Sequence, residues 1–356
     1  MLIIRADGNA RIGAGHLMRC LTIAHAVHAQ YADKEKTNGE TQVLFLCADE
    51  DSARMARDHG FQAGVLDTDY RQMESELSRD SAGICPWDKW ITGTGHVILV
   101  DSYYVTERYL QALHAYGSVF LMDDLQAQPY PVDGVINYNV FADPDLYRRL
   151  YRGQSTKFFL GAQYAPLREQ FQNTEYSIRP AVQQVLLTTG GGDADNIAEQ
   201  ILRAVYAPDI FFHVLVGRFS PHFSGWTERA EQTPNLQIHY DVKNMAELMC
   251  ACDLAITAGG STVYELAAVG IPFVCFSYAE NQEALAESIG RTGSGGFAGA
   301  WHKDRDACTE KIAMLFKQLC KSKELREEYS VCERRLTDGQ GAGRLADILV
   351  KSRIGL

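Results

Sequence analysis

The residue near the start of the chain that is best suited to chemistry is His16, because it ends a glycine-rich loop. The loop GNARIGAGH, residues 8–16, follows the apolar segment LIIRA and precedes a helical pattern. The dipole at a helix N-terminus disfavours a charged imidazolium, and a neutral imidazole can act as a general base. Gly13 and Gly15 would let the loop backbone approach a ligand closely. The alternative is a histidine that only caps the helix or hydrogen-bonds a carbonyl.

This loop fits neither of two familiar phosphate-binding patterns. A dinucleotide-binding G-x-G-x-x-G sequence requires glycine or alanine where Met18 stands, and Asp49 lies too far along the chain to be its acidic partner. A P-loop requires lysine at the position of Ala14. We therefore interpret residues 8–16 as a close-approach loop at the start of a helix.

A second constellation is AGGSTVYE at 258–265, where the apolar pattern LAIT meets a helix. After Gly259 and Gly260, Ser261 or Thr262 would start that helix, and an anion there would be held by free N–H groups and the helix dipole. Glu265, one turn later, could accept two hydrogen bonds from a ribose diol. The alternative is structural, because Thr262 and Glu265 also have the spacing of a capping box.

A third glycine-rich segment is TTGGGDADN at 188–196, between an apolar strand pattern and a helix. Gly191 and its neighbours could direct backbone N–H groups toward a phosphate. The segment could equally be a tight turn in which Asp193 or Asp195 caps the helix.

Polar residues also follow other predicted strands. Asn281 and Gln282 follow PFVCF and are neutral amides suited to sugar hydroxyls. Asp101, Asp123 and Asp124 end strands, where they either face a ligand or cap loops.

Short apolar runs alternate with longer amphipathic ones, which is typical of parallel sheets with helices on both faces. In the helix after His16, Leu17, Leu21 and Ala24 fall on one face. Strands are predicted at 2–6, 43–48, 97–101, 119–123, 134–138, 157–161, 183–189, 210–217, 236–240, 254–257 and 273–277.

The strand–helix series runs twice in the 356 residues, which predicts an α/β fold of two doubly wound, Rossmann-like domains. Such domains would face each other across a cleft, with ligands at the carboxyl ends of the strands. A polar, proline-bracketed segment at 166–180 is predicted to link residues 1–165 and 181–336, and residues 337–356 to form a last helix that packs back on the first domain.

Composition excludes several classes of function. The net charge is −11 and Lys and Arg are scattered, so we expect no nucleic-acid partner. We expect no membrane insertion and no secretory signal, because the apolar runs are too short. Nine scattered cysteines indicate the reducing cytoplasm. Cys250 and Cys252 have no second pair at zinc spacing, so no metal site is expected.

These pieces together resemble a known family, the UDP-2,4-diacetamido-2,4,6-trideoxy-β-L-altropyranose hydrolases of pseudaminic acid biosynthesis, which have the GT-B fold. The AGGSTVYE segment with the later ENQ is also similar to the donor site of the peptidoglycan N-acetylglucosaminyltransferase. The resemblance covers nearly the whole chain. Its motifs are RADGNARIGAGHLMRCLTIA at 5–24, DSYY at 101–104, MDDL at 122–125, GAQYAPLREQF at 161–171, TTGGGD at 188–193, AGGSTVYE at 258–265 and DGQGAGR at 338–344.

The resemblance implies that the second domain binds the UDP of a UDP-activated amino sugar. Glu265 would contact the ribose, and the helix start at Ser261 and Thr262 would hold the pyrophosphate. Arg168, in the motif at 161–171, would reach the phosphates. The family needs no metal and no cofactor, so none is expected here.

The resemblance further implies that His16 is the catalytic base. It would deprotonate a water that attacks the anomeric carbon, and configuration would invert as UDP leaves. Tyr103 would line the sugar pocket, although a tyrosine at such a place also commonly serves only in packing.

Two other functions stay open. A nucleotide-sugar glycosyltransferase for surface or spore-coat polysaccharide biosynthesis would pass the sugar to an acceptor, and a non-catalytic binding protein would need no base. The absence of an apolar or basic cluster in the first half favours water as the acceptor. Residues 31–40 are interpreted as a surface loop, and in the irregular segment 84–95 Trp87 and Trp90 are interpreted as buried anchors.

Overall fold

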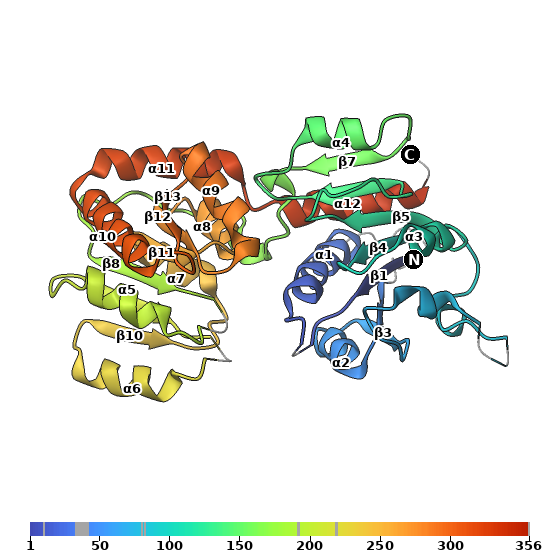
Figure 1. The fold of residues 1–356 in the computed structure, drawn as a ribbon, viewed down its shortest axis with the longest axis horizontal. Coiled ribbons are helices and arrows are strands. Elements are labelled where there is room, and N and C mark those ends of the chain that lie inside the picture. The colour runs from blue at the N-terminus through green and yellow to red at the C-terminus, as the bar shows by residue number, and fades with distance from the viewer. Residues whose placement is uncertain are drawn as a thin grey trace. The chain divides into compact units, whose positions relative to one another are not determined.

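The computed structural model describes residues 1–9, 11–32, 43–79, 81, 83–190, 193–217 and 220–354. The chain forms two compact units: unit 1 is Met1–Arg168 with Gln340–Leu356, and unit 2 is Glu169–Gly339. Each unit contains a parallel sheet between helices (Figure 1). The predicted α/β fold with two Rossmann-like halves is therefore confirmed.

Unit 1 is built on a seven-stranded parallel sheet of order β3-β2-β1-β4-β5-β6-β7. The winding reverses between β1 and β4, which is where open α/β sheets bind ligands. Ala6 of β1 pairs with Asp101 of β4, so the loops that leave these two strands start side by side. The strands are β1 (Leu2–Ala6), β2 (Val43–Cys47), β3 (Gln62–Val65), β4 (His96–Asp101), β5 (Gly117–Met122), β6 (Gly134–Asn137) and β7 (Lys157–Leu160).

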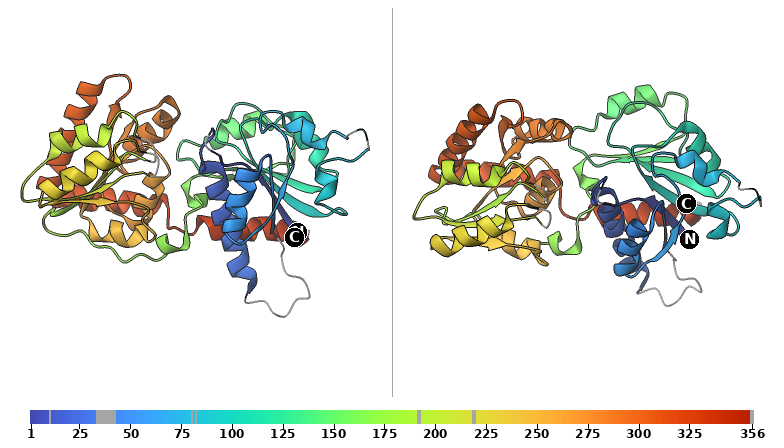
Figure 2. Two further views of the ribbon diagram at one scale, coloured as in Figure 1. Left: turned by 90° about the horizontal axis from the view of Figure 1, so that it is seen from below. Right: turned by 60° about the horizontal axis from the view of Figure 1, so that its bottom comes forward.

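Helices cover both faces of this sheet. One face, with Ile98 and Val119, packs on α3, α4 and two short 3-10 helices, η1 and η2. The helices α1 and α12 lie together in unit 1 and contact β4, as the red α12 among blue and green elements shows (Figures 1 and 2). The bounds are α1 (Gly15–Ala32), α2 (Glu50–Asp58), η1 (Met73–Leu77), η2 (Trp87–Lys89), α3 (Glu107–Leu113), α4 (Pro144–Leu150), η3 (Ala162–Tyr164) and α12 (Gly341–Ile354).

A buried ion-pair network fixes the end of β1. Arg5 donates to Glu76 Oε2 at 2.9 Å and to Asp7 Oδ2 at 2.6 Å, and its side chain is completely buried. Tyr109 donates its hydroxyl to Glu76, and Asp7 accepts from the Ala48 N–H. Because each buried carboxylate has donors, the charges are compensated. The network therefore sets where the loop after β1 begins.

Unit 2 is built on a six-stranded parallel sheet of order β10-β9-β8-β11-β12-β13. This is the same winding as that of β1–β6 in unit 1, and it reverses between β8 and β11. The strands are β8 (Gln184–Thr188), β9 (Phe211–Leu215), β10 (Leu236–His239), β11 (Leu254–Ala258), β12 (Phe273–Ser277) and β13 (Gly296–Ala300).

One face of this second sheet packs on α5, α6 and α10 around Phe212 and Ile256. The helices α8 and α9 contact β11 and β12, and α11 packs on α8. The bounds are η4 (Glu169–Phe171), α5 (Ile197–Val205), α6 (Phe223–Gln232), α7 (Met245–Ala251), α8 (Thr262–Val269), η5 (Glu280–Gln282), α9 (Glu283–Thr292), α10 (Arg305–Lys321) and α11 (Lys323–Leu336).

Two local predictions about packing have different outcomes. The helix after His16 is α1, and its predicted apolar face of Leu17, Leu21 and Ala24 is buried, as predicted. Trp87 is fully buried, which confirms it as an anchor, but Trp90 is 42% exposed, so that prediction is wrong. Trp90 instead lies over Gly64 of β3, where its ring occupies the space of a side chain.

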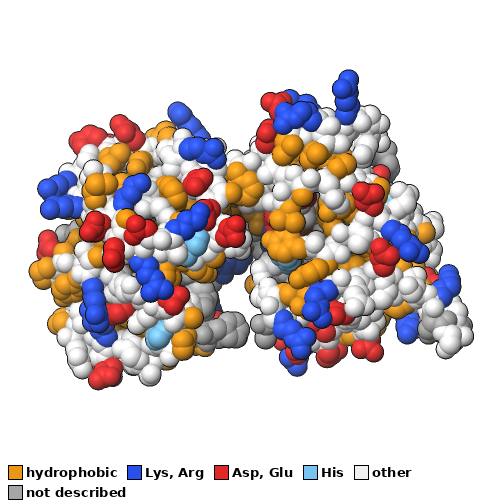
Figure 3. All heavy atoms as spheres, viewed as in Figure 1, with side chains coloured by type: hydrophobic (Ala, Val, Ile, Leu, Met, Phe, Trp, Pro, Cys, Tyr) orange, Lys and Arg blue, Asp and Glu red, His pale blue; other side chains and the backbone are white. Residues whose placement is uncertain are grey.

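The predicted loop at 31–40 falls partly within α1, which continues to Ala32, and residues 33–40 lie outside the described residues. Charged side chains of both signs are scattered over the face of the molecule in Figure 3. Within the described ranges, the helices lack the combination of length and apolar character that a bilayer crossing demands.

Candidate functional site

The loop after β1 is closed by Asn9. Its side-chain oxygen accepts from the N–H groups of Arg11 and Ile12, at 2.9 and 3.2 Å, and its backbone oxygen accepts from the N–H of Gly13 at 2.9 Å. The Asn9 side-chain amide donates to Asp49 at 2.8 Å. Gly13 has a φ of +76°, which a residue with a side chain adopts only with strain. This compact turn delivers the chain to the start of α1.

His16 lies in the first turn of α1, as predicted, and its side chain is 20% exposed. Its Nδ1 is 3.9 Å from Asp101 Oδ1, which is too long for a hydrogen bond but places a carboxylate beside the ring. The edge of one ring meets the face of the other between His16 and Tyr103, with centroids 4.6 Å apart and planes at 82°. The imidazole therefore has a carboxylate and a tyrosine as its near neighbours in unit 1.

Arg19, one turn after His16, is the central residue that sequence reasoning missed. Its Nε and Nη2 donate to the two oxygens of Asp101, at 2.6 and 2.5 Å. Its Nη1 donates to Asp124 at 2.8 Å and to the Tyr138 hydroxyl at 3.0 Å. The available signal was its spacing: a residue three positions after His16 shares its helix face.

The ion pair with Arg19 controls the charge of Asp101. Burial by itself would raise the pKa of this carboxyl, whose side chain is 1% exposed. The adjacent Arg19 guanidinium outweighs burial and lowers the pKa of Asp101 below its usual range. Asp101 is therefore a carboxylate at neutral pH.

The strand-end aspartates were predicted either to face a ligand or to cap a loop, and Asp123 and Asp124 differ in this respect. Asp123 caps its loop, because its Oδ1 accepts from the N–H groups of Leu125 and Gln126, both at 3.1 Å. Asp124 instead accepts from the Tyr103 hydroxyl at 3.3 Å, in addition to Arg19. Tyr103 is 52% exposed, so it lies beside His16 without being a core residue.

In unit 2, the turn from β11 to α8 has an open helix N-terminus. Ser261 is the N-cap and its side chain makes no capping hydrogen bond, while Thr262 is the first helical residue. The capping-box alternative for Thr262 and Glu265 is therefore wrong, because that motif needs Thr262 as the N-cap. Glu265 is half-buried in the first turn. The N–H groups of Val263 and Tyr264 donate to the Gly260 and Ser261 carbonyls, at 3.1 and 3.0 Å, so the N–H groups of Ser261 and Thr262 are the ones at which an anion can bind.

The start of α5 is different, because a carboxylate already occupies it. Asp193 accepts from the N–H groups of Ile197 and Ala198, at 2.6 and 3.1 Å, which confirms the capping alternative for this residue. A negative side chain on these groups repels a phosphate. Gly191, predicted as a contact, lies outside the described residues. The contrast favours the N-terminus of α8 as the anion site of unit 2.

Asn281 and Gln282, the other predicted contacts in unit 2, lie in η5 after β12. Gln282 accepts from the Tyr278 N–H at 3.1 Å, so its side-chain oxygen is used within the loop. Asn281 is exposed. A Cβ atom added at Gly15 or at Gly260 would meet no other atom within 4 Å, so both glycines border open space.

The structure thus divides the predicted residues between the units. Unit 1 brings together Gly13, Gly15, His16 and Tyr103 where β1 and β4 end, and unit 2 brings together Gly260, Ser261, Thr262 and Glu265 where β11 ends, with Asn281 and Gln282 after the neighbouring β12. Arg168 is half-buried in unit 1, after η3.

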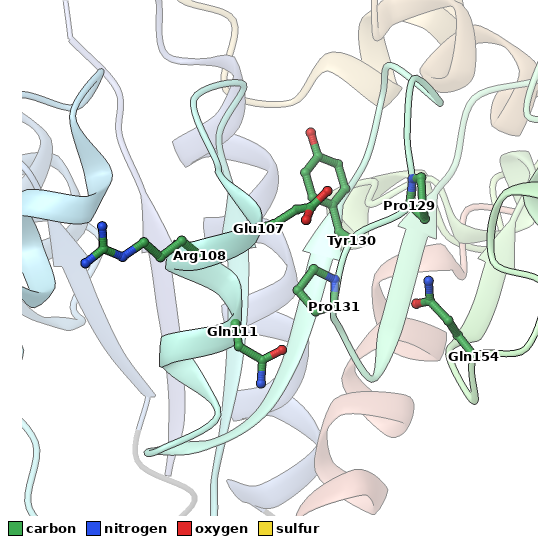
Figure 4. Close-up of a pocket in the computed structure, with 7 residues that line it drawn as sticks. All are labelled: Glu107, Arg108, Gln111, Pro129, Tyr130, Pro131 and Gln154. Carbon is green, nitrogen blue, oxygen red and sulfur yellow. The ribbon is translucent and has the colours of Figure 1, made fainter.

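The described residues offer no metal site, since they contain no group of three or more His, Cys, Asp and Glu side chains that could hold a metal ion. An open hollow of about 610 Å³ lies elsewhere on unit 1 and contains no predicted site residue (Figure 4). It is lined by Glu107, Arg108, Gln111, Pro129, Tyr130, Pro131 and Gln154.

No protein-family model matches the chain. It is 29% identical over 223 residues to the spore coat polysaccharide biosynthesis protein SpsG of Bacillus subtilis, a match that covers 61% of this chain. That match spans 64% of the Bacillus protein, less than two thirds of its length. The chain is also 22% identical over 294 residues to the UDP-2,4-diacetamido-2,4,6-trideoxy-beta-L-altropyranose hydrolase of Campylobacter jejuni, covering 82% of this chain and 97% of that protein.

Solved structures resemble the whole chain. MurG of Acinetobacter baumannii superimposes with a TM-score of 0.66 at 14% identity, covering 98% of this chain and 99% of that one. The calicheamicin glycosyltransferase CalG4 also gives a TM-score of 0.66, at 13% identity, covering 99% of this chain and 98% of that one. These likenesses show that the fold is GT-B, as the sequence predicts.

Proposed function

We propose that the chain is a hydrolase that cleaves a UDP-linked diacetamido-trideoxy sugar at its anomeric C–O bond, with inversion. Its products would be UDP and a free sugar for nonulosonic (pseudaminic) acid synthesis in the cytoplasm. The observation that carries the proposal is His16, held in the first turn of α1 with Asp101 beside it at the point where the winding of the sheet reverses. The likeness to the Campylobacter hydrolase over nearly its full length supports the choice of substrate.

In unit 1, His16 would take the proton of the attacking water. A positioned general base of this kind contributes about 10²–10⁴-fold to the rate. The Asp101 carboxylate beside the ring would stabilise the imidazolium that forms. Tyr103, half exposed beside His16, would contact the sugar.

In unit 2, the N-terminus of α8 would bind the pyrophosphate and Glu265 the ribose hydroxyls. The N–H groups of Ser261 and Thr262 would stabilise the negative charge that develops on departing UDP. The phosphates would also contact Arg168, and the sugar would also contact Asn281 and Gln282. No step is assigned to a metal or a cofactor.

A glycosyltransferase is the second candidate. The structurally similar CalG4 is a glycosyltransferase, and the Bacillus relative is described as a polysaccharide biosynthesis protein. In that case the same residues would activate an acceptor hydroxyl instead of water. A non-catalytic binding protein would not need the carboxylate that faces His16.

The test is to incubate the purified protein with UDP-sugars, including the diacetamido-trideoxy sugar, and to measure UDP release without an acceptor. The hydrolase releases UDP, and proton NMR of the first-formed sugar shows the inverted anomer. Release of UDP only after an acceptor is added would identify a transferase, and binding without release under both conditions would identify a binding protein.

The first prediction concerns the base itself. His16→Asn lowers kcat by about 10²–10⁴-fold because no group remains to take the proton. UDP affinity, measured by calorimetry, stays within about threefold because the nucleotide contacts are on other residues. His114→Asn is the control and keeps wild-type turnover, because His114 is an exposed histidine after α3 that contacts the Pro131 carbonyl. Wild-type kcat in His16→Asn would refute the assignment.

A further inference from the structure

Arg19 holds two carboxylates that face different neighbours. Its fork binds both oxygens of Asp101, whose Oδ1 also lies 3.9 Å from His16 Nδ1. Its remaining nitrogen, Nη1, binds Asp124, which in turn accepts from the Tyr103 hydroxyl. One side chain on α1 is thus connected to both of the residues that the proposed function places at the sugar.

The fork leaves Asp101 little freedom. Two parallel N–H···O bonds fix the plane of a carboxylate as well as its distance, which a single ammonium does not. Cys20 Sγ is a further contact, at 3.5 Å from Asp101 Oδ2. The contacts with Arg19 and Cys20 therefore help to fix the orientation of the Asp101 carboxylate, with Oδ1 toward the imidazole.

The position of this oxygen bears on which imidazole nitrogen carries the proton. A carboxylate only accepts hydrogen bonds, so it favours the tautomer with the proton on the nearer nitrogen. The nearer nitrogen of His16 is Nδ1. The other nitrogen, Nε2, then keeps its lone pair and is the one that can accept a proton from water.

We propose that Arg19 is a positioning residue that holds Asp101 beside His16 Nδ1, favours the Nδ1–H tautomer, and through Asp124 orients Tyr103. The catalytic consequence rests on the proposed function, whereas the tautomer does not. Among the described residues, the charged and titratable groups around His16 include Asp101 and Tyr103 from the end of β4. Arg19 from α1 binds Asp101, and Asp124 from the end of β5 accepts from Tyr103.

The test uses the full-length protein labelled with ¹⁵N, and reads the His16 ring nitrogens by long-range ¹H–¹⁵N correlation at a pH where the ring is neutral. The His16 signals are assigned by their loss in His16→Asn. The wild type is expected to show the Nδ1–H pattern. Arg19→Lys keeps the charge but loses the fork, so it is expected to show a mixture of the two tautomers.

Asp101→Asn gives an independent readout if Arg19→Lys does not fold. An asparagine whose oxygen faces the guanidinium directs its NH₂ group at Nδ1, so His16 is expected to switch to the Nε2–H tautomer. Arg57→Lys is the matched control, because Arg57 on α2 binds Glu50 and the Ala63 carbonyl and does not contact this network. Its His16 signals are expected to equal those of the wild type.

The kinetic arm measures the same variants. Arg19→Lys is expected to lower kcat by about 10²-fold with KM changed little, because positioning is lost and ground-state contacts are kept. Adding Asp101→Asn to Arg19→Lys is expected to cost less than the product of the two single effects, since both act on one unit.

The outcomes separate the two proposals. An unchanged Nδ1–H tautomer in both Arg19→Lys and Asp101→Asn would overturn the inference, whatever the activity. The expected tautomers in a protein that releases no UDP from any UDP-sugar would support the inference about Arg19 and overturn the hydrolase.

Discussion

At the scale of single residues, Glu333 on α11 of unit 2 is a carboxyl group buried in the protein interior. The side chain is fully buried, and neither carboxylate oxygen has a hydrogen-bond partner among the described residues. Two neighbours on the same helix face, Arg326 and Ser330, donate to backbone carbonyls, including that of Gly270. Burial raises the pKa of Glu333 well above its usual range, and the nearby Arg334 offsets this only in part.

Glu333→Gln is therefore expected to stabilise the protein at neutral pH. The unfolded carboxyl ionises above about pH 4.3 while the folded one stays neutral, so stability is lost as pH rises from that value toward the folded pKa. The amide removes this loss and should raise the free energy of unfolding by about 1–3 kcal/mol at pH 7, with no gain near pH 4.

Thermal unfolding from pH 4 to pH 8 checks this prediction. Glu327→Gln is the control, since Glu327 lies on the same helix, is half exposed and pairs with Lys323. It should shift the melting temperature little at any pH. The same gain for Glu333→Gln at pH 4 and pH 8 would show that Glu333 is ionised when folded.

A functional residue could be predicted from the sequence where its neighbours along the chain mark it. His16 is marked by the loop before it and the helix after it, and the structure places it in that first turn. Arg19 was missed because its partner Asp101 lies 82 positions away, and no local pattern connects them. Trp90 was misplaced because aromatic type indicates burial in general, while its position over Gly64 depends on the fold of β3.

At the scale of elements, the turn between β11 and α8 depends on Gly259. Its N–H donates to the Phe276 carbonyl at 2.7 Å, which ties β11 to β12. A Cβ there would lie 3.0 Å from the Ala286 Cβ and 3.1 Å from the Gln282 carbonyl oxygen. Both contacts are closer than ordinary packing allows, so the turn fits only glycine without moving α9.

Gly259→Ala is thus expected to destabilise the protein by about 1–3 kcal/mol. If the proposed nucleotide site is correct, UDP affinity should fall as well, because the first turn of α8 moves with the strand end. Denaturant unfolding and calorimetry with UDP measure the two effects. Gly225→Ala, at an exposed position of α6 with open space around it, is the control and should raise stability slightly. Equal behaviour of the two variants would contradict the packing argument.

Strands could be predicted where large apolar side chains mark them in the sequence. Eleven strands of the described residues were predicted, because each carries several large apolar side chains; in β10, LQIH, these alternate with polar residues. Two strands were not predicted, β3, QAGV, and β13, GFAGA. The first has a single large apolar side chain, Val65, and the second contains two glycines, so neither shows the run of large apolar side chains that marks a buried strand.

At the scale of the whole molecule, the two sheets share one winding order, and each has its candidate residues where that winding reverses. Strand–helix alternation along the chain predicts this, because right-handed crossovers leave few ways to wind a parallel sheet. The membership of α12 in unit 1 rests on specific contacts, such as the hydrogen bond from Gln30 to the Gly343 carbonyl at 3.0 Å.

Because the chain forms two units, UDP binding can be tested by measuring which unit it protects from hydrogen exchange. A ligand that binds only the folded state at a hundred times its dissociation constant adds about 2.7 kcal/mol to stability. If UDP binds at the start of α8, this protection should slow hydrogen exchange across β11, α8 and η5 of unit 2. The core strands β1 and β4 of unit 1 should exchange as in the free protein, since UDP lacks the sugar proposed to contact His16. Hydrogen-exchange mass spectrometry with and without UDP measures both, and protection confined to the loop at 8–16 would place the nucleotide on unit 1 instead.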